Sequence, residues 1–301
     1  MAKAYFINKV LATTVVGSYP VIQSGGLRSL FDPLKSAVET AVADQIAAGV
    51  DIISDGQVRG DMINAFAAAL PGIRELEVIG KVQPASGPIT VKDTKYAISK
   101  APKVKGIITG PTTLAHSLHL STPMYRNKEE LALDIAGALV IEAKSLEAAG
   151  ITLLQIDEPM FSTGMADLGV GRQAIEAITT QVKIPVCMHV CGDLGNIIDE
   201  ILKINVQVLD FEFSKNPANL DLFGHRDLSG RMIGFGCVDS TTNTVETVAE
   251  IRKRIEKGVE VFGPQAMLID PDCGMRMRTR EAAFAKLKNM CQAAKEARLA
   301  L

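Results

Sequence analysis

Eight apolar stretches, each followed by a polar or amphipathic stretch, run through this chain of 301 residues and constrain its fold more than any other feature. The apolar stretches have the length and β-branched content of buried strands, and several of the intervening stretches have the i, i+3, i+4 spacing of helices. The predicted strands cover residues 11–16, 50–54, 104–109, 151–156, 184–190, 206–211, 231–235 and 265–269. The predicted helices cover residues 31–49, 129–150, 173–182, 194–203, 245–258 and 281–299, with short helices from Val91, which Thr90 could cap, and from Pro217.

Strand and helix in alternation, about eight times, predict an α/β fold with a parallel sheet, and the number of repeats indicates a (β/α)8 TIM barrel. We expect residues 1–301 to form one barrel domain. A doubly wound open sheet is the alternative, but the turn after the first strand, GSYPVIQSGG, is not the GxGxxG of that fold. Residues 66–103 are irregular and include the polar run VIGKVQPASGP, so we interpret them as an insertion between the second and third strands.

Composition narrows the class of function. The formal net charge of −2 gives no basic surface excess for nucleic acid or an anionic membrane. The first twenty residues lack a signal-peptide pattern, and no apolar run reaches transmembrane length, so we expect a cytoplasmic protein. The five cysteines, an odd number, argue for free thiols rather than a disulfide framework. The absence of tryptophan argues against an aromatic platform for a flat cofactor or a base.

Polar side chains gather just after the predicted strands. In a barrel, the loops after the strands converge at one end, where the active site lies. Polar groups that follow several different strands are therefore stronger evidence for a site than any single motif. These residues are Ser18, Asp55, Asp157, His189, Cys191, Glu212, Asp239, Asp270, Asp272 and Cys273.

Four of these residues predict a metal site. His189 and Cys191 are two positions apart, so in an extended chain their side chains point the same way and supply half of a tetrahedral zinc site. Glu212 follows the sixth strand and Cys273 the eighth, and together they could complete it. Two thiolates, an imidazole and a carboxylate suit zinc and disfavour magnesium. This anionic set suggests alkylation of a metal-bound thiolate rather than hydrolysis, for which neutral histidine ligands are more usual.

Structural roles are the alternatives for the same residue types. A buried cysteine is most often a small core hydrophobe, which is how we interpret Cys187 and Cys291, while Cys237 stays open between core and site. The acids at Asp55 and Asp239, like the run Asp157-Glu158-Pro159, are equally consistent with caps of the helices that follow them.

Six short motifs and one glutamate resemble, in order and at the same strand ends, the catalytic half of the cobalamin-independent methionine synthases. The likeness extends over essentially the whole chain. The matching motifs are GSYP at 17–20, RGDM at 59–62, GPTT at 110–113, IDEP at 156–159, HVC at 189–191, Glu212, and PDCG at 271–274.

The resemblance implies a zinc ion held by His189, Cys191, Glu212 and Cys273. It also implies that homocysteine is the methyl acceptor. The turn from Val16 through Gly17 to Ser18 would bind the amino acid, and Asp157 would hold its amino group. A second family carboxylate is replaced here by Gln57, at which we expect substrate contact. The candidate catalytic residues are Asp157 and Asp239.

Three departures from the family pattern bear on the methyl donor. The second, amino-terminal barrel of full-length members is absent; Ala115-His116 stands where the family has a tryptophan thought to face the folate; and Asp239-Ser240-Thr241-Thr242 replaces a run whose histidine transfers a proton. A folate amine leaving group needs protonation, whereas a corrinoid does not. The chain therefore resembles the short, single-barrel members, which are implied to take the methyl group from methylcobalamin or from a methylated corrinoid protein.

Several rival functions stay open. A donor of the methyltetrahydrofolate type, or another thiol acceptor such as coenzyme M, would keep the same site chemistry. A decarboxylase of the uroporphyrinogen type would need no zinc. A module that only binds a corrinoid protein would not respond to a thiol at the metal.

Overall fold

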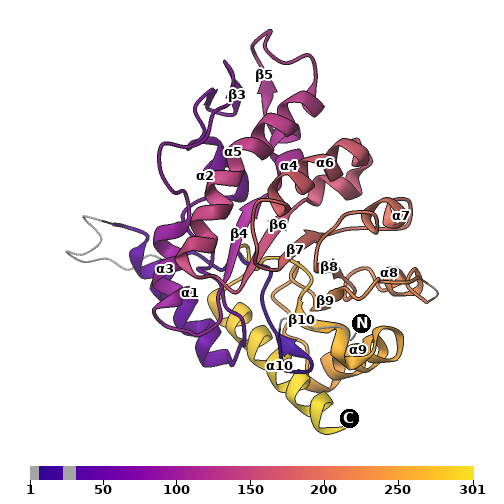
Figure 1. Cartoon of the computed structure of the whole chain (residues 1–301). Coiled ribbons are helices and arrows are strands. Elements are labelled where there is room, and N and C mark those ends of the chain that lie inside the picture. The colour runs from indigo at the N-terminus through magenta and orange to yellow at the C-terminus, as the bar shows by residue number, and fades with distance from the viewer. Residues whose placement is uncertain (1–6, 23–31, 225) are drawn as a thin grey trace.

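A computed structural model describes residues 7–22, 32–224 and 226–301. The described strands of the main sheet are all parallel and occur in the order β1-β10-β9-β8-β7-β6-β4. Figure 1 shows them curling around a common axis, with most of the helices outside. Their bounds are β1 Ala12–Thr13, β4 Lys105–Thr109, β6 Leu153–Asp157, β7 Val186–Val190, β8 Val208–Glu212, β9 Met232–Val238 and β10 Met267–Pro271.

The segment predicted as the second strand connects the two edges of this sheet. Thr14 pairs with Ile52, and Ile53 pairs with Val104, both in parallel fashion. These are isolated bridges rather than a continuous strand, because the carboxylate of Asp51 accepts the hydrogen bond of the Thr13 amide. The sheet nevertheless closes on itself, as the strand–helix alternation predicts for a TIM-barrel-like fold.

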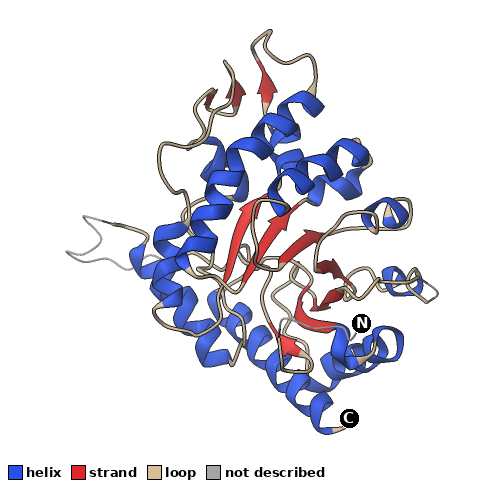
Figure 2. Ribbon diagram, in the orientation of Figure 1, coloured by secondary structure: helices blue, strands red, loops and turns tan. Residues whose placement is uncertain are grey.

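The helices lie mostly around the sheet (Figure 2). The longer ones are α1 Lys35–Ala48, α5 Lys128–Ala149, α6 Leu168–Thr179, α9 Val248–Phe262 and α10 Arg280–Leu299. The first residue of the helix predicted over 31–49 lies outside the described residues. The short helices are α2 Met62–Ala67, α3 Val91–Ile98, α4 Pro111–Ser117, α7 Ile198–Ile201 and α8 Ala218–Asp221, with 3-10 turns η2 Pro159–Thr163 and η3 Pro264–Ala266. Within the described ranges, no helix combines the length and apolarity that a membrane span requires.

Two local predictions about helices were wrong. Thr90 precedes α3 without capping it through its side chain; its hydroxyl instead donates to Glu142 of α5 at 2.7 Å. The helix predicted over 194–203 is shorter and comprises only α7, because the amides at its expected start donate hydrogen bonds to side chains. Asp193 accepts from the Gly195 amide, and Asn219 accepts from the Leu194 amide.

The irregular segment contains more structure than its pattern indicates. It includes the strands β2 Ile73–Arg74 and β3 Glu77–Val78 as well as α3. These strands form a small second sheet with β5 His119–Leu120, in the order β2-β3-β5. The small sheet therefore draws on a strand beyond β4 and is not confined to residues 66–103.

The barrel interior changes character along its axis. A small buried apolar cluster fills the end at which the strands begin, and it consists of Ile7, Ala12, Ile52, Leu153, Cys187, Val208, Met232 and Leu268. Further along the strands the fully buried residues are polar, and they include Lys105, Gln155, Asp210 and Asp270. TIM barrels usually fill these layers with branched apolar side chains, so a polar interior is costly unless its groups pair with one another.

Candidate metal and thiol site

Three side chains that can bind a metal meet at the carboxyl ends of β7 and β10. The ligand atoms of His189, Cys191 and Cys273 all lie within 4.8 Å of one another. Neither ring nitrogen of the buried His189 has a hydrogen-bond partner within the described part of the chain. A buried imidazole is costly without partners, and a metal ion coordinated by one nitrogen would remove part of that cost. The three residues therefore fit a zinc ion.

The two sulfur atoms influence each other's protonation. Their mutual contact is the largest cause in both cases: it lowers the pKa of Cys191 and raises the pKa of Cys273 well above its ordinary value. The pair thus favours one thiolate beside one thiol. Burial lowers the pKa of His189, but nearby Asp210 outweighs burial and leaves that pKa well above the ordinary value.

Glu212, the fourth predicted ligand, is outside this three-residue group. Its Oε1 accepts hydrogen bonds from the Gly192 amide and from the Asn216 side chain. Its other oxygen, Oε2, makes no hydrogen bond with the described residues, and its charge raises the pKa of Cys191 against the larger effect of Cys273. Glu212 is thus near the sulfurs with one oxygen free, and its role as a ligand remains a prediction.

A cavity of about 310 Å³ opens beside the three ligand residues. Four of the predicted substrate contacts line it: Val16, Ser18, Gln57 and Asp157. Its other lining residues, to which sequence reasoning gave no role, are Gly60, Asp61, Met62, Pro159 and Gly274, which lie within the family-like motifs, and Arg276, which lies outside them. Larger cavities of about 720 and 480 Å³ lie over α3 and α2. We place the site in the smaller cavity because, of these three, it is the one that His189, Cys191 and Cys273 line.

The turn from Val16 to Ser18 is held in contact with two other loops. A side chain at Gly17 would collide with Ile107 and with the amide oxygen of Gln57, so a larger residue would displace both side chains. A side chain at Gly274 would likewise collide with the Ser18 hydroxyl. The Ser18 carbonyl accepts a hydrogen bond from the Met275 amide at 2.7 Å, which ties this turn to the loop that follows Cys273.

Asp157 is positioned by the polar interior of the barrel. It ends β6 in register with His189 on β7. Gln155 donates to Asp157 at 2.7 Å and to the Val16 carbonyl at 2.6 Å, and its own oxygen accepts from Lys105 at 2.6 Å. Burial is the largest influence on Asp157 and raises its pKa to about 6, against the opposing charge of His189.

Asp210 lies directly behind His189, the candidate histidine ligand. The two residues are register partners on β8 and β7, and the His189 Nδ1 atom is 3.4 Å from the Asp210 Oδ1 atom, outside hydrogen-bond geometry. Gly234 on the next strand leaves the room that the carboxylate needs. Since Nδ1 lies toward Asp210, Nε2 is the nitrogen left for the sulfur side. Sequence reasoning did not assign Asp210 this position, although a polar residue in the middle of the apolar run VLDFE is a signal that could have indicated it.

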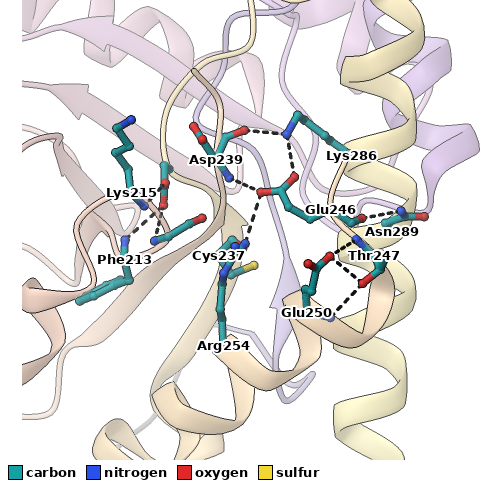
Figure 3. A network of polar contacts seen from close by, with 12 residues as sticks. Phe213, Lys215, Cys237, Asp239, Glu246, Thr247, Glu250, Arg254, Lys286 and Asn289 are labelled. Atoms are coloured by element: carbon teal, nitrogen blue, oxygen red, sulfur yellow. Dashed lines mark hydrogen bonds and ion pairs between the residues drawn. The ribbon is translucent and has the colours of Figure 1, made fainter. Parts of the chain in front are cut away.

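Asp239, the second candidate catalytic residue, is absent from the residues that line the cavity. Its carboxylate accepts two hydrogen bonds from Thr241, both at 2.7 Å. Its backbone belongs to the network in Figure 3, in which Glu246 accepts from the Asp239 amide and Lys286 donates to the Asp239 carbonyl. The structure thus places Asp239 in a tightly held turn, and its catalytic role is untested.

Fold and site together define a class of protein: a β/α-barrel enzyme with two sulfurs and one imidazole placed to hold a metal ion beside a small cavity. Comparison with known proteins identifies the family. Residues 11–296 match the family model described as "Cobalamin-independent synthase, Catalytic domain". The chain therefore belongs to the cobalamin-independent methionine synthase family, and it is a methyltransferase.

Two relatives illustrate the match. The chain is 42% identical to a methionine synthase of Methanothermobacter marburgensis, over 95% of this chain and 100% of the relative. It is 44% identical to a methionine synthase of Methanocaldococcus jannaschii, over 95% of this chain and 99% of the relative. A solved B12-independent methionine synthase from Shewanella sp. W3-18-1, in complex with selenomethionine, has the same fold, with a TM-score of 0.87 at 23% identity over 97% of this chain and 100% of the other.

Proposed function

We propose that this enzyme transfers a methyl group from methylcobalamin, or from a methylated corrinoid protein, to the sulfur of homocysteine and so forms methionine. The observation that supports this reaction most directly is the meeting of His189, Cys191 and Cys273 within 4.8 Å beside a cavity. The relatives that are named methionine synthases support the same acceptor.

The proposed metal is zinc, held by these three residues and by Glu212. When bound, zinc would lower the pKa of an incoming thiol, so that its sulfur reacts as a thiolate near neutral pH. The roles of the protein's own groups are to bind and to orient. Asp157 would accept the ammonium group of the amino acid, and the turn at Val16, Gly17 and Ser18 would fix its other end. Such alignment of two reactants removes an entropic barrier on the order of several kcal/mol.

A corrinoid donor fits the residues better than a folate donor does. The carbon–sulfur bond forms while the bond between the methyl carbon and the donor breaks, and the electron pair of that bond stays with the donor. A folate amine must also gain a proton, and the histidine that the family uses for this is replaced by the run that starts at Asp239. The chain also lacks the family tryptophan that faces the folate.

An assay of zinc-loaded protein with methylcobalamin and homocysteine tests the proposal through the methionine that forms. The variant Cys273→Ser should lose stoichiometric zinc and lose methionine formation while keeping its circular dichroism spectrum. The matched control is Cys291→Ser on α10, whose sulfur lies 3.8 Å from the Thr13 hydroxyl and outside the metal group. The control should keep both zinc and activity. Absence of methionine from fully zinc-loaded wild-type protein would reject the donor or the acceptor.

Two alternatives are separated by the same preparation. Methyltetrahydrofolate in place of methylcobalamin tests the folate reaction, and coenzyme M in competition with homocysteine tests the other thiol.

We further propose that residues 1–301 are one barrel domain, with 66–103 inserted between its second and third strands. Deletion of residues 72–88, which hold β2 and β3, should leave zinc binding intact.

A further inference from the structure

One cation among the described residues that line the cavity, Arg276, makes no ion pair there, although the charge of Asp61 acts on it from the same cavity. Arg276 is half-buried, and its Nη1 donates to the Gln57 carbonyl at 2.9 Å. Within the described ranges its guanidinium makes no ion pair and no other hydrogen bond. The remaining charged lining residues are Asp61 and Asp157. A guanidinium has five N–H donors in a planar fork that matches a carboxylate, so most of its donors are unused here.

Hydrogen bonds to backbone carbonyls on two sides hold Arg276 at the cavity. Gly56 and Gln57 have φ angles of +84° and +44°, an unusual left-handed pair, and the carbonyl of Gln57 accepts the hydrogen bond from Arg276. On the other side, the Met275 amide is bonded to the Ser18 carbonyl. The guanidinium is therefore tethered between two loops, and it is three residues from the sulfur of Cys273.

Ser18 presents further donors at the same wall of the cavity. Its amide and its hydroxyl donate to no acceptor in the part of the chain that the structure describes, although the residue lines the cavity. Asp61 interacts electrostatically with Arg276 but forms no ion pair with it, and its carboxylate oxygens already accept hydrogen bonds from the amides of Ile63 and Asn64 and from the Asn64 side chain. The wall thus combines unused hydrogen-bond donors with one positive charge.

We propose that Arg276 binds the α-carboxylate of the thiol substrate together with Ser18, opposite Asp157, which takes the ammonium group. This inference rests on the proposed function and deepens it, because it restricts the acceptor to a zwitterionic amino-acid thiol. An anionic thiol without an ammonium group would satisfy Arg276 and leave Asp157 without a partner. A thiol amine without a carboxylate would leave Arg276 without one.

The test compares homocysteine with 3-aminopropane-1-thiol, which is the same molecule without its carboxylate. Charged hydrogen bonds of this kind change affinity about 10- to 100-fold. In Arg276→Met, the ratio of kcat/KM for homocysteine to that for the aminothiol should fall by that factor, and Arg276→Lys should restore part of it. Arg278→Met is the matched control, because Arg278 is in the same loop but is not a lining residue; it should keep the wild-type ratio.

Equal losses on both thiols in Arg276→Met would mean that the side chain only supports the Gln57 loop, and would overturn the inference. Unchanged kcat/KM for both thiols would overturn it as well. The methyl donor in these assays is methylcobalamin. Should it methylate neither thiol, equilibrium binding of the two thiols to the zinc protein replaces kcat/KM. A preference for homocysteine that depends on Arg276 would then uphold the inference while the proposed donor fails.

Discussion

The buried carboxyl of Asp55 makes the stability of the barrel depend on pH in a defined direction. Asp55 is 8% exposed. It accepts hydrogen bonds from the Gln57 amide at 2.9 Å and from the Thr94 hydroxyl at 3.1 Å. Burial is the largest influence on it and raises its pKa from 3.8 to about 6. The folded protein therefore holds this proton more tightly than the unfolded chain does.

The sign follows from that difference in proton binding. A raised pKa in the folded state contributes stability that is fully present below pH ~4 and is lost as the pH rises through ~6. A shift of about two units corresponds to roughly 3 kcal/mol. With an unfolding entropy of about 2.1 cal/mol/K per residue, this is about 5 °C in Tm for a chain of this length.

Asp55→Asn removes the ionisation and keeps the shape. The amide oxygen can accept from the Gln57 amide, and the amide nitrogen can donate to the Thr94 hydroxyl. We expect the Tm of the variant, measured relative to wild type, to rise by about 5 °C between pH 4 and pH 8. Thermal unfolding followed by circular dichroism at both pH values measures this difference, in which pH effects common to both proteins cancel.

Asp51→Asn is the matched control with the opposite sign. Burial raises the pKa of Asp51, but the ion pair with Lys9 and hydrogen bonds from Thr13 outweigh it and lower the net value. That stability is present above the unfolded pKa and is lost in acid. This variant should therefore lose Tm relative to wild type as the pH rises to about 4, and its difference from wild type should stay level between pH 4 and pH 8. A flat profile for Asp55→Asn between pH 4 and pH 8, or the same slope in both variants over that range, would refute the assignment of the Asp55 pKa to burial.

Three further predictions follow from the site. Gly274→Ala should raise the KM for homocysteine at least ~10-fold, because the new methyl group displaces Ser18; an unchanged KM would show that this contact does not matter. Asp210→Ala should weaken zinc binding about 10- to 100-fold in a chelator competition, since the carboxylate behind His189 orients the ring, and equal affinity would contradict that role. Glu158→Ala should cost about 2–4 kcal/mol, because Glu158 accepts hydrogen bonds from the buried amides of Thr112 and Thr113 in α4, which would lose their acceptor; a Tm loss below ~2 °C would contradict this.

The meeting of His189, Cys191 and Cys273 could be predicted from the sequence because strand geometry brings these three residues together. In parallel strands, residues at the carboxyl ends share one rim, and this places His189 and Cys273 together although 84 positions separate them. The actual form of the second barrel strand could not be predicted from the sequence. Its apolar pattern correctly predicts pairing with both neighbouring strands. However, the side chain of Asp51 accepts the hydrogen bond of the Thr13 amide, and the described residues there form only isolated bridges.

Contacts made by loops were beyond sequence reasoning. The position of Arg276 depends on a backbone hydrogen bond between Met275 and Ser18, which are far apart in the chain. The hydrogen bonds that hold Glu212 come from Gly192 and Asn216, neither of which belongs to a strand. No local pattern records such pairings, because any residue offers the same backbone groups.

Polar residues in the barrel interior link the two ends of the proposed substrate site. Gln155 donates both to the Val16 carbonyl, in the turn that would bind the amino acid, and to Asp157, which would bind its ammonium group. Lys105 holds the amide of Gln155 in this orientation and also donates to the Val15 carbonyl at 2.6 Å. An apolar residue at position 155 would leave a buried carboxylate and a buried ammonium without these partners, at a cost in stability. The polar interior is therefore best explained by the site: it fixes the spacing between two groups that must bind the same small molecule.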